Sequence, residues 1–199
     1  MNSLFSFTKK KSEKNGSILA YRLFGKTSIF VHGFDQSTDY IVFMWREALG
    51  HLPKTFSAKS VLMLGLGGGS AIKEIRHCFP GCKITVVEWD PVMIDLYHNI
   101  HKEEDPISII QGDASVVVPA MTEKFDLVLV DLFTGNVTPK ELRSASMVSA
   151  ISHVTHLNGF CILNAFVSLD LLPVFDQHFS RKDTWEYKFN TLVLYKPNF

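Results

Sequence analysis

Four glycines placed directly after an apolar run are the feature of this sequence best suited to hold a ligand. The run VLMLG (61–65) continues through Gly67, Gly68 and Gly69 into SAIKEIRHCF (70–79), which has the pattern of a helix. Because glycine lacks a Cβ, a backbone turn built from it can bend sharply and approach a ligand closely. A tight strand-to-helix turn needs glycine for steric reasons even when nothing binds, so these glycines alone leave binding open.

A carboxylate at the end of the next predicted strand strengthens the case for binding. Glu88 ends KITVVE (83–88) and lies 23 residues after Gly65, where an acidic side chain in this architecture meets the ribose hydroxyls of a nucleoside. The alternative is a contribution to the N-cap of the following helix, a role that Asp90 fills more naturally. Trp89 could cover an adenine face, or it could belong to the core.

A second carboxylate follows the third strand of the pattern. Asp113 and Ala114 stand in QGDA, after ISIIQ (107–111). The carboxyl ends of parallel strands share one edge of a sheet, so we expect both residues beside the same ligand. Asp113 could also act as the N-cap of a short helix over 114–121, and the two roles are compatible.

The absence of a phosphate-binding motif after the glycines indicates which class of ligand would bind. The glycines are followed by Ser-Ala-Ile, and no GKS or GKT follows them, so a polyphosphate is disfavoured. The sequence therefore points to a nucleoside without a polyphosphate, as in S-adenosylmethionine chemistry.

These residues must be positioned by alternating strands and helices, which is typical of a mostly parallel sheet. Further strands are predicted at FDLVLVD (125–131), FCILNAF (160–166) and NTLVLYK (190–196), and further helices over 139–156 and 169–179. Before this domain, which we place over 54–199, SILAYRLF (17–24) and SIFVHGF (28–34) predict a β-hairpin.

The remaining N-terminal segments complete the predicted organisation. A helix from Thr38 or Asp39 to Pro53 would join the hairpin to the main domain, so that 17–53 form one N-terminal element. Residues 1–16 are polar and lysine-rich, and we expect a mobile tail there.

Composition bounds the protein class. The chain has 199 residues, 46% hydrophobic, with 20 Lys+Arg against 20 Asp+Glu, which suits one core and argues against general nucleic-acid binding. Its three cysteines are too few for a disulfide scaffold, and no apolar run reaches about 18 residues. We expect a cytoplasmic protein that binds neither nucleic acid nor membrane. The pairs His98/His101, His153/His156 and Cys78/Cys82 lack further ligands at a suitable spacing, so we expect no metal.

Five blocks together resemble the spermidine synthase (polyamine aminopropyltransferase) family in order and spacing. They are IFVHGFDQSTDYIVFMWREALGHLP, VLMLGLGGGS, ITVVEWDP, QGDA and FDLVLVDLFTG, within roughly residues 28–135. The resemblance implies an α/β protein with an S-adenosylmethionine-dependent methyltransferase-like Rossmann fold. Its sheet would have seven mostly parallel strands, preceded by a small N-terminal β-element.

The resemblance also implies roles for individual residues. Glu88 would hold the ribose, Asp113 the adenine amino group, and Gln36 would line the cofactor pocket. Asp131 would be the catalytic residue. A carboxylate that ends a buried strand could accept a proton from an amine nucleophile. The alternative is that Asp131 only bonds the backbone of the loop that follows it.

Three departures from the family pattern bear on the substrate. The family commonly has GGGDGG in the glycine loop, and the aspartate that meets the aminopropyl amine falls on Gly68. A second aspartate three residues after the catalytic one is Thr134 here. The Tyr-His pair of the joining helix is Trp45-Arg46, and we expect Arg46 to repel a polyamine.

The sequence therefore predicts a transferase that binds S-adenosylmethionine or its decarboxylated form. It would transfer an aminopropyl group to a small-molecule amine and form a homodimer through the N-terminal element. Gly68 favours a methyltransferase as the alternative, because no carboxylate would repel that of ordinary S-adenosylmethionine. Thr134 and Trp45-Arg46 favour a third class, a non-catalytic nucleoside-binding or scaffold protein.

Overall fold

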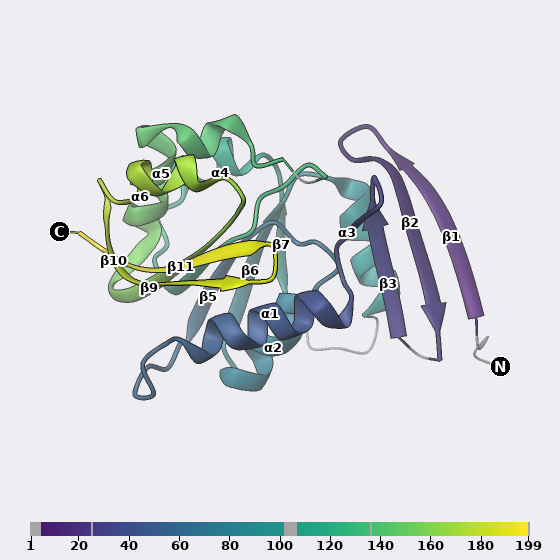
Figure 1. Cartoon of the computed structure of the whole chain (residues 1–199), viewed down its shortest axis with the longest axis horizontal. Helices are drawn as coiled ribbons and strands as arrows, with labels where there is room; N and C mark the ends of the chain where they lie inside the picture. The colour runs from purple at the N-terminus through teal and green to yellow at the C-terminus, as the bar shows by residue number, and fades with distance from the viewer. Residues whose placement is uncertain (1–4, 25, 102–106, 136, 199) are drawn as a thin grey trace.

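The chain folds into a large sheet with helices on both faces and a small sheet at one end (Figure 1). The computed structural model describes residues 5–24, 26–101, 107–135 and 137–198. The N-terminal strand and the C-terminus lie at opposite ends of the view in Figure 1.

The large sheet has seven strands in the order β10-β11-β9-β8-β5-β6-β7. Its bounds are β5 (Ser60–Leu64), β6 (Lys83–Glu88), β7 (Ser108–Gln111), β8 (Phe125–Val130), β9 (Thr155–Phe166), β10 (Phe179–Tyr187) and β11 (Asn190–Pro197). The five neighbouring strands β7, β6, β5, β8 and β9 are parallel to one another, whereas β11 is antiparallel to both of its neighbours, β9 and β10. The predicted α/β fold, with a mostly parallel seven-stranded sheet, is confirmed.

The unbroken apolar run of β5 is explained by burial on both sides of the sheet. Leu62 and Leu64 belong to one core cluster, and Val61 and Met63 to the other. Helices α1 (Asp39–Gly50) and α2 (Ser70–Cys78) cover one face, while α4 (Ala114–Ala120), α5 (Ala145–Val154) and α6 (Leu172–Phe175) cover the other (Figure 1). Parallel strands covered on both faces read as continuous hydrophobic runs.

The small sheet corrects the prediction of a mobile tail for residues 5–16, whereas residues 1–4 of that predicted tail lie outside the described part of the chain. Strand β1 (Phe5–Ser12) pairs with β2 (Gly16–Leu23), and this pair continues into β3 (Lys26–Val31) and β4 (Phe34–Asp35). The predicted hairpin is therefore present as β2 and β3. The lysines that resembled a tail lie on an edge strand, where charged side chains are favoured because they discourage pairing with another chain.

Helix α3 (Pro91–Ile100) joins the two sheets. Its Met93 and Leu96 pack against Ile18, Ala20, Ile29 and Val31 of the small sheet. The side chain of Asp90, just before the helix, is fully buried and caps it by accepting the Val92 backbone N–H at 2.9 Å. Asp90 also accepts hydrogen bonds at 2.6 Å from Ser12 Oγ and Asn15 Nδ2. These contacts tie the small sheet to the main domain.

The C-terminal third departs from the predicted helices. The segment 139–156 forms a 3-10 turn (Lys140–Arg143) and α5, and 169–179 forms only a 3-10 turn (Leu169–Leu171) and α6. Strand β10 was not predicted, because its largely exposed, charged residues lack the apolar alternation of a half-buried strand.

Candidate active site

A cavity of about 610 Å³ lies at the carboxyl ends of β5, β6 and β8, with part of its wall from the small sheet. This is the edge at which open α/β sheets bind ligands. The cavity is lined by eight of the nine predicted site residues: Gln36, Gly65, Gly67, Glu88, Trp89, Asp113, Ala114 and Asp131.

The glycine turn forms one wall and is shaped by backbone contacts. Gly65 has φ +92°, and a Cβ there would lie 2.2 Å from the Asp131 carbonyl oxygen. Its N–H donates to the Val87 carbonyl at 2.9 Å. Only glycine suits this position, because β5, β6 and β8 approach one another closely where the turn begins.

Gly68 differs from the prediction, because it does not line the cavity. A Cβ at Gly68 would lie 2.0 Å from Ser37 Cβ, and the Gly68 N–H donates to the Gln36 carbonyl at 2.9 Å. The absence of a side chain therefore lets the segment that carries Gln36 pack onto the turn. Gln36 itself lines the cavity.

Glu88 is held rigidly at the cavity wall. Its two carboxylate oxygens accept the backbone N–H groups of Leu66 and Asp90, each at 2.9 Å. Burial raises the pKa of Glu88, and these hydrogen bonds oppose that shift. Trp89 also lines the cavity, and the Lys14 ammonium lies 5.1 Å from the centroid of its ring.

Asp113 has both of its predicted roles, because it lines the cavity and is the N-cap of α4. Its Oδ1 accepts hydrogen bonds from the backbone N–H of Ser115 at 2.8 Å and from Ser115 Oγ at 2.7 Å, so it caps α4. Asp113, Ala114 and Ser115 all line the cavity. The cap orients this carboxylate at the sheet edge.

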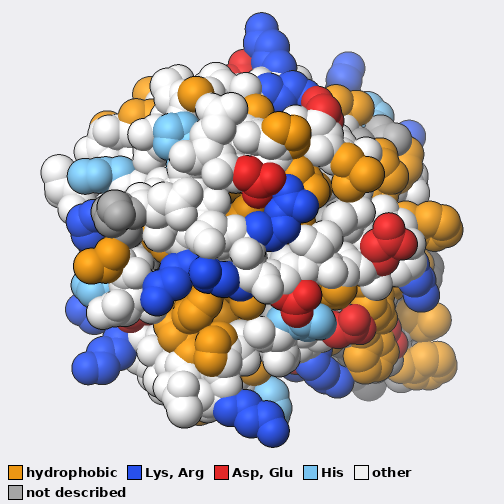
Figure 2. Space-filling model, turned by 60° about the vertical axis from the view of Figure 1, so that its left-hand side comes forward, with side chains coloured by type: hydrophobic (Ala, Val, Ile, Leu, Met, Phe, Trp, Pro, Cys, Tyr) orange, Lys and Arg blue, Asp and Glu red, His pale blue; other side chains and the backbone are white. Residues whose placement is uncertain are grey.

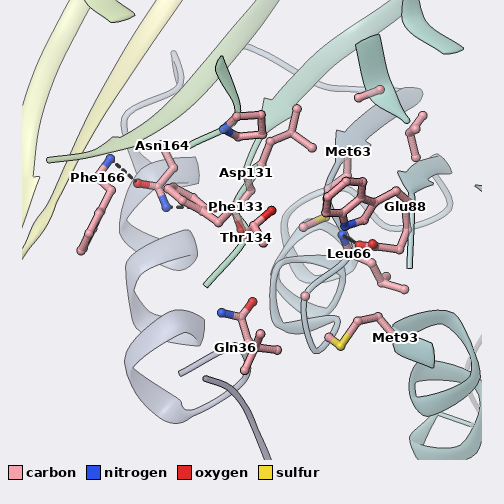
Figure 3. Close-up of a pocket in the computed structure, with 18 of the residues that line it drawn as sticks. Gln36, Met63, Leu66, Glu88, Met93, Asp131, Phe133, Thr134, Asn164 and Phe166 are labelled. Atoms are coloured by element: carbon pink, nitrogen blue, oxygen red, sulfur yellow. Dashed lines mark hydrogen bonds between the residues drawn. The ribbon is translucent and has the colours of Figure 1, made fainter. Parts of the chain in front are cut away.

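Asp131 lies across the cavity from Glu88, with Asn164 beside it (Figure 3). Asn164 Nδ2 donates to Asp131 Oδ1 at 2.9 Å, and Asn164 Oδ1 accepts the Phe166 N–H at 3.1 Å. Burial raises the pKa of Asp131 from 3.8 to about 6, while interactions with Asn164 and the Trp45 indole oppose the rise. The carboxylate bonds another side chain, so the alternative of a purely loop-bonding aspartate is not what the structure shows.

The expectation that Arg46 repels a cationic substrate is wrong. Arg46 Nε and Nη2 donate to the two carboxylate oxygens of Glu74 at 2.9 and 3.0 Å, joining α1 to α2. Arg46 is not among the cavity-lining residues, whereas Trp45 is. Neighbouring residues on a helix face different directions, so the charge points away from the site.

Several lining residues were missed by the sequence analysis. Among them are Asn15, Tyr40, Asn164, Phe189 and Asn190, which come from separated segments. The hydroxyl of Tyr40 accepts a hydrogen bond from Asn190 Nδ2 and donates one to the Tyr187 carbonyl at 3.3 Å. Only Asn164 gave a signal, as a polar residue in the apolar run FCILNAF, because a buried amide needs partners.

The cavity wall is acidic. The charged residues lining it are Glu88, Asp113, Asp131 and Glu141, and the described part of the wall has no Lys, Arg or His. By contrast, basic and acidic side chains are interspersed on the face of the molecule shown in Figure 2. The electrostatics of the cavity therefore favour a cation.

Two further observations concern other classes of site. Within the described ranges, no three His, Cys, Asp or Glu side chains are grouped so as to hold a metal ion. Also among the described residues, no helix combines the length and apolar character needed to cross a membrane.

Comparison with known proteins finds similarity to methyltransferases and aminopropyltransferases. Residues 61–159 match a family model described as a methyltransferase domain. A probable polyamine aminopropyl transferase of Bifidobacterium longum is 23% identical over 163 residues, which is 81% of this chain and 36% of the relative. A polyamine aminopropyltransferase of Korarchaeum cryptofilum is 33% identical over 120 residues, 55% of this chain and 36% of the relative.

A solved spermidine synthase in complex with the transition-state analogue AdoDATO superposes with a TM-score of 0.72 at 13% identity, covering 98% of this chain and 80% of that one. The chain has the fold of this spermidine synthase and resembles the polyamine aminopropyltransferases in sequence. The N-methyltransferase NodS of Bradyrhizobium japonicum, solved with S-adenosyl-L-homocysteine, has a TM-score of 0.65 at 12% identity, covering 82% and 90% of the two chains. The chain spans about a third of the length of the two curated relatives described above.

Proposed function

We propose that this spermidine synthase-like chain is a transferase that moves an aminopropyl group from decarboxylated S-adenosylmethionine to an amine. The observation that carries the proposal is the partly buried Asp131 carboxylate, held by Asn164 in a cavity whose other end has Glu88 and Asp113 at the sheet edge. We also propose a cytoplasmic location, which the free thiols of Cys78, Cys82 and Cys161 support.

The lining residues fit an S-adenosyl nucleoside. The turn at Gly65 and Gly67 lets a ligand approach the backbone closely. Glu88 and Asp113 would recognise the ribose and the adenine. Trp89 offers an aromatic face beside Glu88. An acidic wall without basic residues suits both a sulfonium donor and an amine acceptor.

Asp131 would manage the proton of the acceptor amine. An amine with pKa near 10.4 is mostly protonated at pH 7, and presenting it neutral costs about 4 to 5 kcal/mol. The donor, when bound, supplies a carbon on a sulfonium: the amine forms a C–N bond to it while the C–S bond breaks and its electron pair returns to sulfur. A carboxylate with a pKa of about 6 can accept the released proton at neutral pH, directly or through water. Asn164 holds that carboxylate in place.

A donor-binding comparison tests the proposal. Thermal stabilisation by decarboxylated S-adenosylmethionine is compared with that by the ordinary form, since a ligand at 100 times its Kd adds about 2.7 kcal/mol. We expect the decarboxylated form to stabilise more. Asp131→Asn should abolish product formation and retain donor binding. Binding of neither form would favour the non-catalytic scaffold.

A methyltransferase is the second candidate, favoured by Gly68. The packing of Gly68 against Ser37 leaves no room for a carboxylate that would repel the carboxylate of ordinary S-adenosylmethionine. The match of residues 61–159 to a methyltransferase domain supports the same reading. Stronger stabilisation by the ordinary form, together with methyl transfer to an amine, would select this candidate.

A further inference from the structure

Four phenylalanines surround the end of the cavity where Asp131 lies. Phe34 follows the turn after β3, Phe133 is in the loop after β8, Phe166 ends β9, and Phe189 is in the turn between β10 and β11. All four line the cavity. Their convergence from four separate segments gives this end a wall of several phenylalanine rings, which we call the aromatic wall.

Two contacts show that this wall is built by the fold. The rings of Phe133 and Phe166 meet edge to face, with centroids 6.1 Å apart and an interplanar angle of 84°. A Cβ at Gly135 would lie 3.9 Å from Phe34 Cδ2, so the loop after Asp131 approaches the small sheet. Figure 3 shows Phe133 and Phe166 beside Asn164, on the far side of the cavity from Glu88 and Met93.

The outer part of the wall leaves apolar surface exposed. Phe189 is 75% exposed and Phe34 is 42% exposed although both line the cavity. An exposed aromatic ring at a cavity mouth gains free energy when a ligand removes it from water. These rings are therefore available to cover the part of an acceptor that lies away from its reacting nitrogen.

The charges at this end suit one cationic group. Asp131 serves the reacting amine, and Thr134 occupies the position three residues later. The remaining lining carboxylate is Glu141, on the 3-10 turn Lys140–Arg143, whose Leu142 belongs to the core cluster on the α4 and α5 side of the sheet. A second ammonium group among the phenylalanines would lose hydration without a paired carboxylate.

We propose, on the basis of the function proposed above, that the acceptor is a monoamine whose other end is an aromatic or branched hydrocarbon group. The amine would lie at Asp131 and the hydrocarbon group among Phe34, Phe133, Phe166 and Phe189. The aromatic wall thereby selects against diamines.

Calorimetric titration of the full chain with two amines tests this selectivity. The probes are 2-phenylethylamine and butane-1,4-diamine, titrated with and without 5′-methylthioadenosine. We expect 2-phenylethylamine to bind about tenfold more tightly or better, which is the scale of discrimination that an apolar pocket gives. Equal or tighter binding of butane-1,4-diamine would overturn the proposal.

Substitutions test whether the aromatic wall causes the preference for 2-phenylethylamine. Phe189→Ala should remove most of the preference without changing butane-1,4-diamine affinity. Phe24→Ala is the matched control, because Phe24 is 76% exposed and is not a lining residue. Glu141→Gln should weaken the binding of both amines to the same extent and leave the preference unchanged. A preference that survives Phe189→Ala, or a loss in Glu141→Gln that is confined to diamine affinity, would contradict the assignment.

The same titrations separate this proposal from the proposed function. Nucleoside binding is measured with 5′-methylthioadenosine alone, and its absence would count against the transferase. The amine titrations without nucleoside decide the acceptor class in either case.

Discussion

The side-chain amide of Asn164 bonds Asp131 Oδ1 at 2.9 Å and is itself fixed by accepting the Phe166 N–H at 3.1 Å. Burial raises the pKa of the Asp131 carboxylate, and this hydrogen bond lowers it. The amide therefore positions the carboxylate and extends the pH range in which it is a base.

Loss of this amide should change the pH dependence of the reaction. In Asn164→Ala we expect the acidic limb of kcat/KM, near pH 6 in the wild type, to move to higher pH, with a loss of about tenfold at pH 6. Asn190→Ala is the control, because Asn190 bonds Tyr40 and should leave the limb in place. A uniform fall in rate without movement of the limb would show that Asn164 does not act through Asp131.

Removing the charge of Asp131 should increase stability above neutral pH. Because folding raises its pKa from 3.8 to about 6, the group's favourable contribution to stability is complete below pH 3.8 and lost as pH rises through about 6. We expect Asp131→Asn to be about 2 to 3 kcal/mol more stable than the wild type at pH 8 and equal to it near pH 3. Urea unfolding at both pH values measures this. Equal stability at pH 8 would mean that the carboxylate is hydrated in solution.

A side chain at Gly68 should disturb the contact between the glycine turn and the N-terminal segment. The added Cβ would lie 2.0 Å from Ser37 Cβ, so Gly68→Ala should cost about 1 to 3 kcal/mol through overpacking. Gly50→Ala is the control, since nothing lies within 4 Å of a Cβ there. Thermal unfolding compares the two. An unchanged Tm for Gly68→Ala would show that this segment moves freely away from the turn.

The bonds of Asp90 should hold the small sheet in place. Asp90→Ala removes the acceptor for Ser12, Asn15 and the Val92 N–H, and we expect a loss of about 3 kcal/mol. Relative to the wild type, backbone hydrogen exchange in Asp90→Ala should become faster in β1 and β2 and should change less in β5. The exposed Asp95 of α3 provides a control in Asp95→Ala. Uniform exchange changes across both sheets would argue against a local anchor.

The outer face of the small sheet should mediate the homodimer that the sequence predicts. Phe7 is 58% exposed and pairs in register with Tyr21, whose ring stacks on Phe30 at 5.7 Å. We expect light scattering to give twice the 22.5 kDa chain mass, and Phe7→Glu to give the monomer. A monomeric wild type would contradict this pairing.

The sequence alone was sufficient to predict the sheet edge and the carboxylates gathered there. Apolar runs that end at Gly65, Glu88 and Asp131 define buried parallel strands, and topology alone brings their carboxyl ends together. These are properties of local pattern, because a strand covered on both faces must be apolar throughout and a tight turn must be glycine.

Only the tertiary structure determined the partners of these groups. The bond from Asn164 to Asp131, the pairing of Arg46 with Glu74, and the packing of Gly68 on Ser37 join residues from different segments. The edge strands β1 and β10 were missed for a related reason, since they are stabilised by pairing with neighbours and lack a buried apolar pattern of their own. Such contacts depend on how distant elements pack, which hydrophobic periodicity does not encode.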